Sequence, residues 1–391
     1  MKNKVLIVFK YPHHWNKNVV QKFNNYYDTE FLYVSNYLDK SFKEIVEVIN
    51  NIIQSKNIQI VVFDVDYFKF INLFFIKEIK AKKKILITGD DFELHNINSI
   101  TASECDLVLS ACALSVLKYK EKGYESYILH FESETKGKKN INYSEEKEID
   151  VLFFGHLTPD RKEILSYIEK EGIKLKNVGH EGSISALPEN ELLNLISKSK
   201  IVINLSKSRS TSVIDYSSEK TYHFYYQFKG RIMLAGVNGA ACVSEYSPMQ
   251  ELLFNSDEVP TFFTKHECVE ILKKLLKDEK LLKNYIQKFA NKAYELSDDK
   301  KNFEPIYNAI ERPNNRKVKL LKIPYWYARI VVKQILIRNI KFSTFIKKIT
   351  EFNLIFKITK NSSLVTKLLI TVESILSIIW YSLISIFKNK K

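Results

Sequence analysis

Three basic residues and one glycine in the second half of the chain have the types and spacing to hold a diphosphate. Gly155 directly follows an apolar run, where a glycine permits a tight turn and brings backbone amides near a phosphate. Arg161 comes about one turn into the helix expected next. Arg231 opens a second expected helix, residues 229–237, and Lys229 flanks it. Because a helix N-terminus carries partial positive charge, these residues predict a site for an anionic leaving group.

Four further residues beside predicted strands and turns are candidates for the rest of this site. His156 adjoins the glycine turn, and Asn204 ends a predicted strand. Gly239 follows the second helix, and Glu245 ends the next strand, where a carboxylate suits hydrogen bonds to ribose or sugar hydroxyls. Each candidate also fits a simpler role as a turn glycine, a surface charge, a structural ion pair or a cap.

A second group of polar residues lies in the first half and predicts acid–base chemistry. Asp90, Asp91 and His95 follow the expected strand 84–88, which places them at the carboxyl edge of a parallel sheet. Asp91 or His95 there could act as general base on an acceptor hydroxyl in an inverting reaction. Helix capping by the aspartates is the simpler alternative. Residues 13–15 (His-His-Trp) follow the first strand and suit either a sugar-stacking platform or loop packing.

The sequence predicts no metal site. Asp64 and Asp66 have the Asp-X-Asp spacing that can hold a divalent cation on a diphosphate, but the anion-binding pattern lies in the other half, so a polar strand end is favoured. No zinc-protease, hydrolase or P-loop motif occurs. The cysteines lie far apart and predict reduced thiols in a cytoplasmic protein: Cys105, Cys112, Cys242 and Cys268.

Short β-branched or aromatic runs alternate with helical patterns, which is typical of βα units around parallel sheets. A polar stretch, residues 136–148, divides two such series and predicts a linker. We therefore expect an α/β protein with two doubly wound domains, residues 1–135 and 149–300, and ligands at the carboxyl ends of the strands. The predicted strands are 5–9, 30–34, 58–63, 84–88, 107–110, 127–129, 150–154, 177–179, 201–204, 241–244 and 261–263.

The second half resembles the nucleotide-sugar-binding domain of GT-B glycosyltransferases of the glycosyl transferases group 1 type, in the branch of spore-maturation-type proteins. The first half resembles the N-terminal domain of that branch, so the resemblance covers residues 1–300. The segments that carry it are 151–161 (VLFFGHLTPDR), 199–205 (SKIVINL), 228–248 (FKGRIMLAGVNGAACVSEYSP), 251–254 (ELLF), 87–91 (ITGDD) and 106–110 (DLVLS).

The resemblance implies two Rossmann-like domains facing each other across a cleft, with a nucleotide-diphosphate sugar as donor substrate and no permanently bound cofactor. It places Arg231 and the turn after its helix against the donor's diphosphate, which fixed cations and helix dipoles stabilise without a metal. This sequence departs from the family pattern at Leu234, where a Glu that contacts the ribose is usual. Either Glu245 or another residue supplies that contact, or nucleotide binding is weakened.

The net charge of the chain lies in residues 312–391, which contain 17 Lys or Arg and two acids, Glu351 and Glu373. The whole chain has the same net charge, +15. Basic residues alternate there with Trp, Tyr and Phe, a pattern typical of a helical segment at a bilayer interface. The sequence therefore predicts an anionic membrane as partner of 312–391. It excludes nucleic acid because the apolar stripes are too continuous for a phosphate-tracking surface. The expected helical segments are 324–341, 343–359 and 363–387, of which we expect the last to lie in the interface rather than to span the bilayer or pack on the body.

Together these features predict a glycosyltransferase that is peripheral on the inner face of the cell membrane. It would move a sugar to a hydroxyl of a lipid-linked or surface glycan, as in bacterial cell-surface polysaccharide biosynthesis. Two other functions fit the sequence. Leu234 fits a non-catalytic nucleotide-sugar-binding scaffold, and the basic surface fits a teichoic-acid-type polyol-phosphate transferase, although the His-centred motifs of such enzymes are not seen. The sugar, the nucleotide, the acceptor and the stereochemical course stay open.

Overall fold

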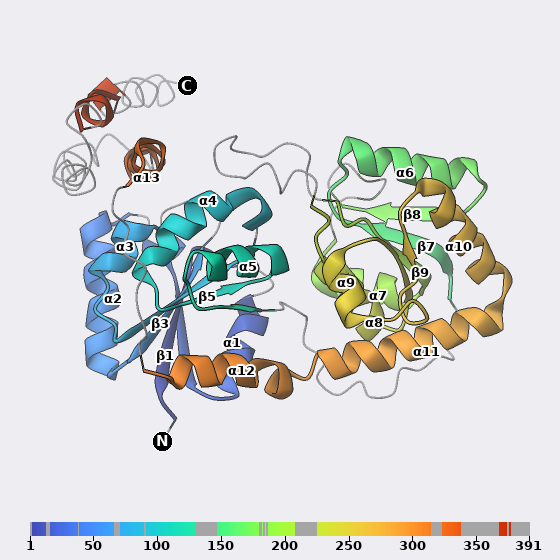
Figure 1. Cartoon of the computed structure of the whole chain (residues 1–391), viewed down its shortest axis with the longest axis horizontal. Helices are drawn as coiled ribbons and strands as arrows, with labels where there is room; N and C mark the ends of the chain where they lie inside the picture. The colour runs from blue at the N-terminus through green and yellow to red at the C-terminus, as the bar shows by residue number, and fades with distance from the viewer. Residues whose placement is uncertain are drawn as a thin grey trace. The chain divides into compact units, whose positions relative to one another are not determined.

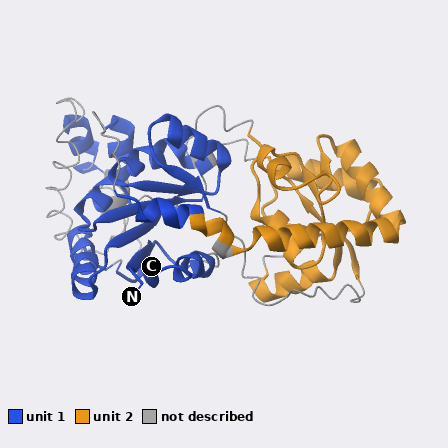
Figure 2. Ribbon diagram, turned by 60° about the horizontal axis from the view of Figure 1, so that its bottom comes forward, with its two compact units in different colours: residues 1–129, 214–219, 305–391 blue, residues 130–213, 220–304 orange. Residues whose placement is uncertain are grey.

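The computed structural model contains two compact units, each built round a parallel β-sheet (Figures 1 and 2). Unit 1 takes in residues 1–129 and 305–391, and unit 2 most of the residues between them. The predicted α/β architecture with two doubly wound sheets is confirmed. The structure describes residues 2–12, 16–37, 39–65, 71–89, 91–129, 147–179, 182, 184, 187–207, 225–313, 323–337, 367–373 and 375–376.

Unit 1 has six parallel strands in the order β2-β1-β3-β4-β5-β6. The central strands are buried along most of their length, which explains why they are nearly continuous apolar runs. The strands are β1 (Lys4–Phe9), β2 (Asp28–Tyr33), β3 (Ile60–Val65), β4 (Lys83–Thr88), β5 (Leu107–Ser110) and β6 (Ser126–Ile128). The helices between them are α1 (Asn16–Asn24), α2 (Phe42–Lys56), α3 (Leu73–Glu78), α4 (Asp91–Thr101) and α5 (Ala113–Glu121).

Unit 2 has five parallel strands in the order β11-β10-β9-β7-β8. Read from its other side, this is the strand order of unit 1 without the last strand. The strands are β7 (Ile149–Phe154), β8 (Leu175–Val178), β9 (Ser199–Asn204), β10 (Ala241–Glu245) and β11 (Thr261–Phe262). The helices are α6 (Pro159–Lys170), α7 (Glu189–Ser197), α8 (Gly230–Val237), α9 (Pro248–Leu253), α10 (Lys265–Lys277) and α11 (Glu279–Leu296).

Helix α12 (Asp299–Glu311) carries the chain from unit 2 back into unit 1. Lys83, at the start of β4, donates to the carbonyl of Arg312 at 2.6 Å and to other carbonyls at the end of this helix. The hydroxyl of Tyr27 donates to Glu311 Oε1 at 2.9 Å. A lysine that caps the last carbonyls of a helix is a common way to end one, and here it also fastens the returning chain to the sheet.

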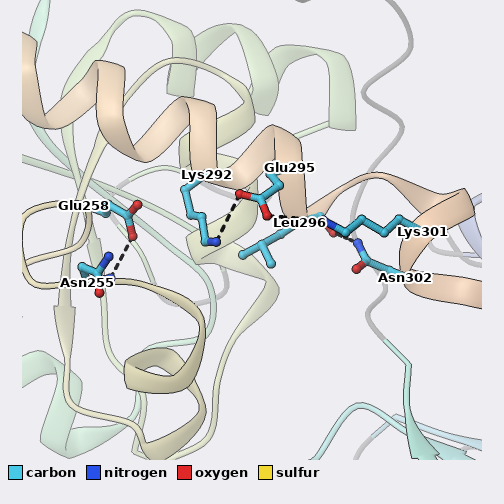
Figure 3. A network of polar contacts seen from close by, with 7 residues as sticks. All are labelled: Asn255, Glu258, Lys292, Glu295, Leu296, Lys301 and Asn302. Atoms are coloured by element: carbon cyan, nitrogen blue, oxygen red, sulfur yellow. Dashed lines mark hydrogen bonds and ion pairs between the residues drawn. The ribbon is translucent and has the colours of Figure 1, made fainter. Parts of the chain in front are cut away.

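Polar contacts in unit 2 join the end of α11 to the start of α12 (Figure 3). Glu295 accepts a hydrogen bond from Lys292 Nζ at 3.2 Å and pairs with Lys301 at 3.6 Å. Asn302 Nδ2 donates to the carbonyl of Leu296. Because these side chains are exposed, their pairs stabilise the fold little and chiefly fix the geometry of the turn.

Helix α13 (Tyr325–Ile337) packs into the core of unit 1. Tyr327 is fully buried, and its hydroxyl accepts from the backbone N–H of Leu73, the first residue of α3, at 3.0 Å. The same hydroxyl shares a hydrogen bond of 2.9 Å with Thr101 Oγ1. The first helix of the basic tail is thus part of unit 1 rather than an appendage.

Most of the remaining tail lies outside the described residues, including 343–359 and much of 363–387. Within the described part of the chain, no helix combines the length and the apolar character needed to cross a membrane.

Candidate functional site

The carboxyl edge of the unit 2 sheet has a switch point between β7 and β9. These strands are neighbours in the sheet, although β8 separates them in the sequence. The chain leaving β7 goes to β8 on one side, and the chain leaving β9 goes to β10 on the other. Open α/β sheets bind ligands in the crevice at such points. The residues at the ends of β7 and β9 therefore define the candidate site.

Gly155 follows β7 and leaves room for a charged side chain. Its φ of +130° is a conformation that L side chains rarely adopt. A Cβ at this position would collide with Nη2 of Arg231. Gly179, after β8, packs against the same turn, since a Cβ there would lie 2.5 Å from the carbonyl oxygen of Gly155. The Arg231 guanidinium therefore packs directly against the glycine turn, which has no side chain in its way.

Arg231 is held at the switch point by contacts that leave its charge uncompensated. Its Nη1 donates to Asn204 Oδ1 at 3.1 Å, and its guanidinium carbon lies 4.7 Å and 5.2 Å from the ring centroids of Phe153 and Phe154. Its Nε is buried and has no hydrogen-bond partner among the described residues. Burial, and then the nearby Arg161, lower the pKa of Arg231 to about 9, so it stays charged at neutral pH. A partly buried cation whose Nε has no partner among the described residues is suited to an anionic ligand.

Asn204 is the buried hub that orients Arg231. Its Nδ2 donates to Ser206 Oγ at 2.9 Å and to Ser244 Oγ at 2.8 Å. Because both amide protons are used in this way, Oδ1 faces the guanidinium. Ser206 and Ser244 were not among the sequence candidates. The one feature of the sequence that could have identified these two serines is that they lie at the carboxyl ends of β9 and β10.

Glu245 is nearly buried at the end of β10. Its Oε2 accepts from the backbone N–H of Lys207 at 2.9 Å, and its carbonyl accepts from Ser206 Oγ at 2.8 Å. Burial raises the pKa of Glu245 above its ordinary value of 4.5. Lys207 in turn pairs with Asp160 in the first turn of α6 at 2.6 Å. Glu245 thus fixes the loop after β9, and its contact with a ribose stays a prediction.

Arg161 lies beside the site and ties two loops together. Its Nη1 donates to the carbonyl of His156 at 2.8 Å, and its Nη2 to the carbonyls of Leu205 at 3.4 Å and Lys207 at 3.5 Å. These bonds join the loop before α6 to the end of β9. They give Arg161 a positioning role, while its contact with a diphosphate, like that of the His156 side chain, stays a prediction.

The N-terminus of α8 lies at the same edge of the sheet as Arg231. Lys229 is its N-cap residue and makes no side-chain cap, because an ammonium group cannot accept from a backbone N–H. Its Nζ donates instead to Gln227 Oε1 at 2.9 Å. The first turn contains no acidic residue, and the space around Gly230 is open. Because a helix N-terminus carries partial positive charge, this turn favours an anion at the edge of the sheet where Arg231 lies.

The prediction for Gly239 needs correction. This glycine has a φ of +75° and follows the C-terminal end of α8, just before β10 begins. Its carbonyl accepts from Lys147 Nζ at 2.9 Å, and the same ammonium group binds the carbonyl of Ser197. Lys147 precedes β7 and Ser197 precedes β9, so all three lie at the amino edge of the sheet. Gly239 is a turn glycine at the edge opposite the switch point.

The prediction that Asp91 is a general base is also corrected. Asp91 is fully buried, and four neighbours donate to its carboxylate. Ser110 Oγ and Thr88 Oγ1 bind Oδ2, the former at 2.6 Å, while Asn98 Nδ2 and Tyr119 OH bind Oδ1 at 2.7 Å and 3.0 Å. A carboxylate offers about four acceptor positions, so none is left for an acceptor hydroxyl. Asp91 joins α4 and α5 to β4 and β5.

His95 occupies the same buried cluster and does not reach a surface. Its ring lies 4.7 Å from the ring of Tyr119, and its Nε2 is 3.3 Å from Lys122 Nζ. An ammonium group can only donate, so Nε2 is the acceptor in this contact. The cationic neighbour and the complete burial correct the prediction of a catalytic role for His95.

Other predicted positions lie outside the described residues: 13–15, Asp66, Asp90 and the linker up to residue 146. Over the described part of the chain, no cluster of His, Cys, Asp or Glu side chains is arranged to hold a metal ion. The four cysteines, all of them described residues, are buried and form no disulfide.

Residues 158–303, under half of the chain, match a family model described as glycosyl transferase-like, whereas no curated protein sequence matches. Solved structures share both units. An alpha-glucosyltransferase in complex with UDP-glucose and DNA containing an abasic site aligns with a TM-score of 0.56 and 13% identity over 80% of this chain and 100% of that one. The chain has the GT-B fold.

Two further GT-B structures are equally distant in sequence. HepE of Anabaena, in complex with UDP and glucose, aligns with a TM-score of 0.56 and 11% identity over 78% of this chain and 98% of that one. Sucrose-phosphate synthase of Thermosynechococcus elongatus aligns with a TM-score of 0.53 and 7% identity over 78% and 96%. These findings support a place among GT-B glycosyltransferases, and none of them separates the spore-maturation-like branch from the rest.

The exclusion of nucleic acid as a partner is wrong. The similar structures include alpha-glucosyltransferases solved with DNA, one with an abasic site and one with a 13-mer containing an HMU base. The exclusion rested on the apolar stripes of the tail, whereas these complexes share the GT-B fold with the body of the chain. A fold that accommodates DNA in these proteins gives no ground for excluding it here.

Proposed function

We propose that this protein is a glycosyltransferase that moves a sugar from a nucleotide-diphosphate sugar to a hydroxyl of a lipid-linked or surface glycan. The observation that carries the proposal is Arg231, a charged guanidinium at the switch point of unit 2, whose buried Nε has no hydrogen-bond partner among the described residues. The GT-B fold and the glycosyl transferase-like match support the reaction class. The structures of similar proteins with UDP or UDP-glucose favour uridine as the nucleotide.

The proposed reaction depends chiefly on a site that stabilises the negative charge of the leaving group. The acceptor oxygen forms a bond to the anomeric carbon while the bond from that carbon to the β-phosphate oxygen breaks, and the departing diphosphate takes up negative charge. The acceptor proton passes to a base or to solvent. Arg231 and the N-terminus of α8 would bind the departing diphosphate. Because these donors are fixed in place, we propose that the donor site needs no metal ion.

The basic tail supports a location at the cytoplasmic face of an anionic membrane. It concentrates 17 basic residues against two acidic ones. Such a segment would hold the enzyme near a lipid-linked acceptor and raise the rate of encounter without a new contact at the active site. Within the glycosyltransferases we place the chain in the spore-maturation-like branch on the strength of the segments quoted above.

The test is a transfer assay with a panel of nucleotide sugars, with and without a metal chelator. The acceptors are lipid-linked glycan, free glycan and duplex DNA with hydroxymethylated bases. We expect turnover of a uridine-linked sugar that survives chelation and is greatest with the lipid-linked acceptor. Transfer to DNA alone would contradict the glycan acceptor and leave the donor site intact. If the protein neither binds nor hydrolyses any nucleotide sugar, the glycosyltransferase proposal fails.

Leu234 favours a second candidate, a nucleotide-sugar-binding protein without turnover. It lies one turn after Arg231 on α8, at the position where the resembling family has a ribose-binding Glu. The Leu234→Glu variant separates the two candidates. A gain of transfer from no measurable activity supports the binding protein, whereas an already active wild type supports the enzyme.

A further inference from the structure

A helical segment near the C-terminus exposes an unbroken apolar face. Residues 367–373 and 375–376 are helical, and five aliphatic side chains on them are largely exposed. Such a set on one short helix is unusual for a surface in water. We call it the tail face; its members are Leu368 (66% exposed), Leu369 (46%), Val372 (47%), Ile375 (42%) and Leu376 (60%).

The five side chains share one side of the helix. At about 100° per residue they fall within an arc of about 120°, and Ile370 points about 160° away from the middle of that arc. Ile370 is buried and belongs to the core of unit 1. The segment is therefore apolar on both sides. Ile370 packs it against the protein, and the wider apolar arc faces outward.

The segment is fixed to a rigid part of unit 1. Arg329 Nε on α13 donates to Glu373 Oε2 at 2.8 Å, and Ile370 lies in the same core cluster as Tyr327 and Val331. The buried Tyr327 hydroxyl bonds to the start of α3. The tail face thus has a defined position relative to the sheet of unit 1.

The charges of the tail identify the occupant. Residues 312–391 contain 17 basic residues and only two acidic ones, Glu351 and Glu373. Glu373 is paired with Arg329. An aliphatic arc in a segment of strong positive charge matches a surface that is apolar inside and anionic at its boundary. Duplex DNA has the negative charge but no apolar interior to take up five aliphatic side chains. A second copy of this chain would bring an equally positive tail, and the two would repel each other.

We propose that the tail face inserts into the headgroup boundary of an anionic bilayer and that it is the membrane-contacting element of unit 1. This deepens the membrane location given in the proposed function and rests on it. The donor site lies in unit 2, so membrane binding and donor binding can fail separately.

The test is sedimentation with vesicles that contain about a third anionic lipid, using the full chain. The variant carries Leu368→Gln, Leu369→Gln and Leu376→Gln, and the matched control carries Leu117→Gln and Leu252→Gln, two exposed leucines elsewhere. We expect the variant to lose at least about tenfold in vesicle affinity and the control to keep it. UDP affinity, melting temperature and oligomeric state should be the same in all three proteins.

Equal sedimentation of variant and wild type would overturn the proposal. So would binding of duplex DNA in place of vesicles at about 0.15 M salt, or a wild-type dimer that the variant converts to monomer. A second readout uses Leu368→Cys and Leu252→Cys, each carrying a polarity-sensitive fluorophore. A blue shift on adding vesicles is expected only for the label at 368, and equal shifts at both sites would contradict insertion by the tail face.

Discussion

The two sheets share one strand order yet treat their carboxyl edges differently. In unit 1 the polar cluster centres on Asp91, between β4 and β5, and four donors fill its carboxylate. In unit 2 the cluster centres on Asn204 and Arg231, at the switch point between β7 and β9, and Nε of Arg231 has no hydrogen-bond partner among the described residues. The difference teaches that a buried carboxylate with all its acceptor positions filled holds elements together, whereas a guanidinium with a donor to spare at a switch point is available to a ligand.

The largest expected effect is on stability in the saturated cluster. Asp91→Ala leaves several buried donors without an acceptor, so we expect the free energy of unfolding to fall by about 4 kcal/mol. Urea unfolding followed by intrinsic fluorescence measures it. Asp257→Ala removes an exposed aspartate paired with Lys288 and should leave the free energy of unfolding nearly unchanged. An Asp91 variant of unchanged stability that loses transfer activity would restore its role as a base.

The next prediction compares two arginines of unit 2. Their replacement by Met should change the free energy of unfolding in opposite directions. Arg161→Met removes bonds to three carbonyls and should lower the free energy of unfolding by about 2 kcal/mol. Arg231→Met removes a partly buried cation, for which the described residues offer no carboxylate partner, and should raise it by about 1 kcal/mol. The same urea experiment measures both. Equal destabilisation by the two substitutions would show that Arg231 is as structural as Arg161.

The smallest effect concerns Glu245 and pH. Burial raises its pKa in the folded state, so the fold favours the protonated carboxyl. The stability contributed by this group is present at low pH and is lost as pH rises from 4.5 through the folded-state pKa. Glu245→Gln does not titrate. The free energy of unfolding of the variant should therefore rise relative to that of the wild type between pH 4.5 and neutrality. A constant difference across that range would show that Glu245 is solvated as in the unfolded chain.

Local patterns in the sequence predicted the fold. Apolar runs followed by glycine or polar residues located the strands, because this signal depends on residues adjacent in sequence, and the same patterns marked Gly155 and Arg231 separately as candidates. The error at Gly239 was avoidable. A glycine between a helix and the next parallel strand must lie at the amino edge of the sheet, away from the ligand edge.

Contacts between distant residues could not be predicted in this way. Ser110 and Tyr119 saturate Asp91 from 19 and 28 positions along the chain, and Tyr327 reaches Leu73 across 254 positions. Nothing in the local pattern of Asp90, Asp91 and His95 distinguishes a buried cluster from an exposed base. The return of α12 and α13 to unit 1 likewise depends on tertiary packing that periodicity does not encode.

The central claim is that Arg231 binds the donor's diphosphate, and calorimetric titration with UDP tests it most directly. Three proteins are titrated: wild type, Arg231→Lys and Arg231→Met. The charge-assisted bonds of a buried guanidinium are worth roughly 2–3 kcal/mol, so Arg231→Met should raise the Kd for UDP by about 100-fold. Arg231→Lys should fall between, since it keeps the charge and loses the fork of donors. Wild-type affinity for UDP in Arg231→Met would contradict the account.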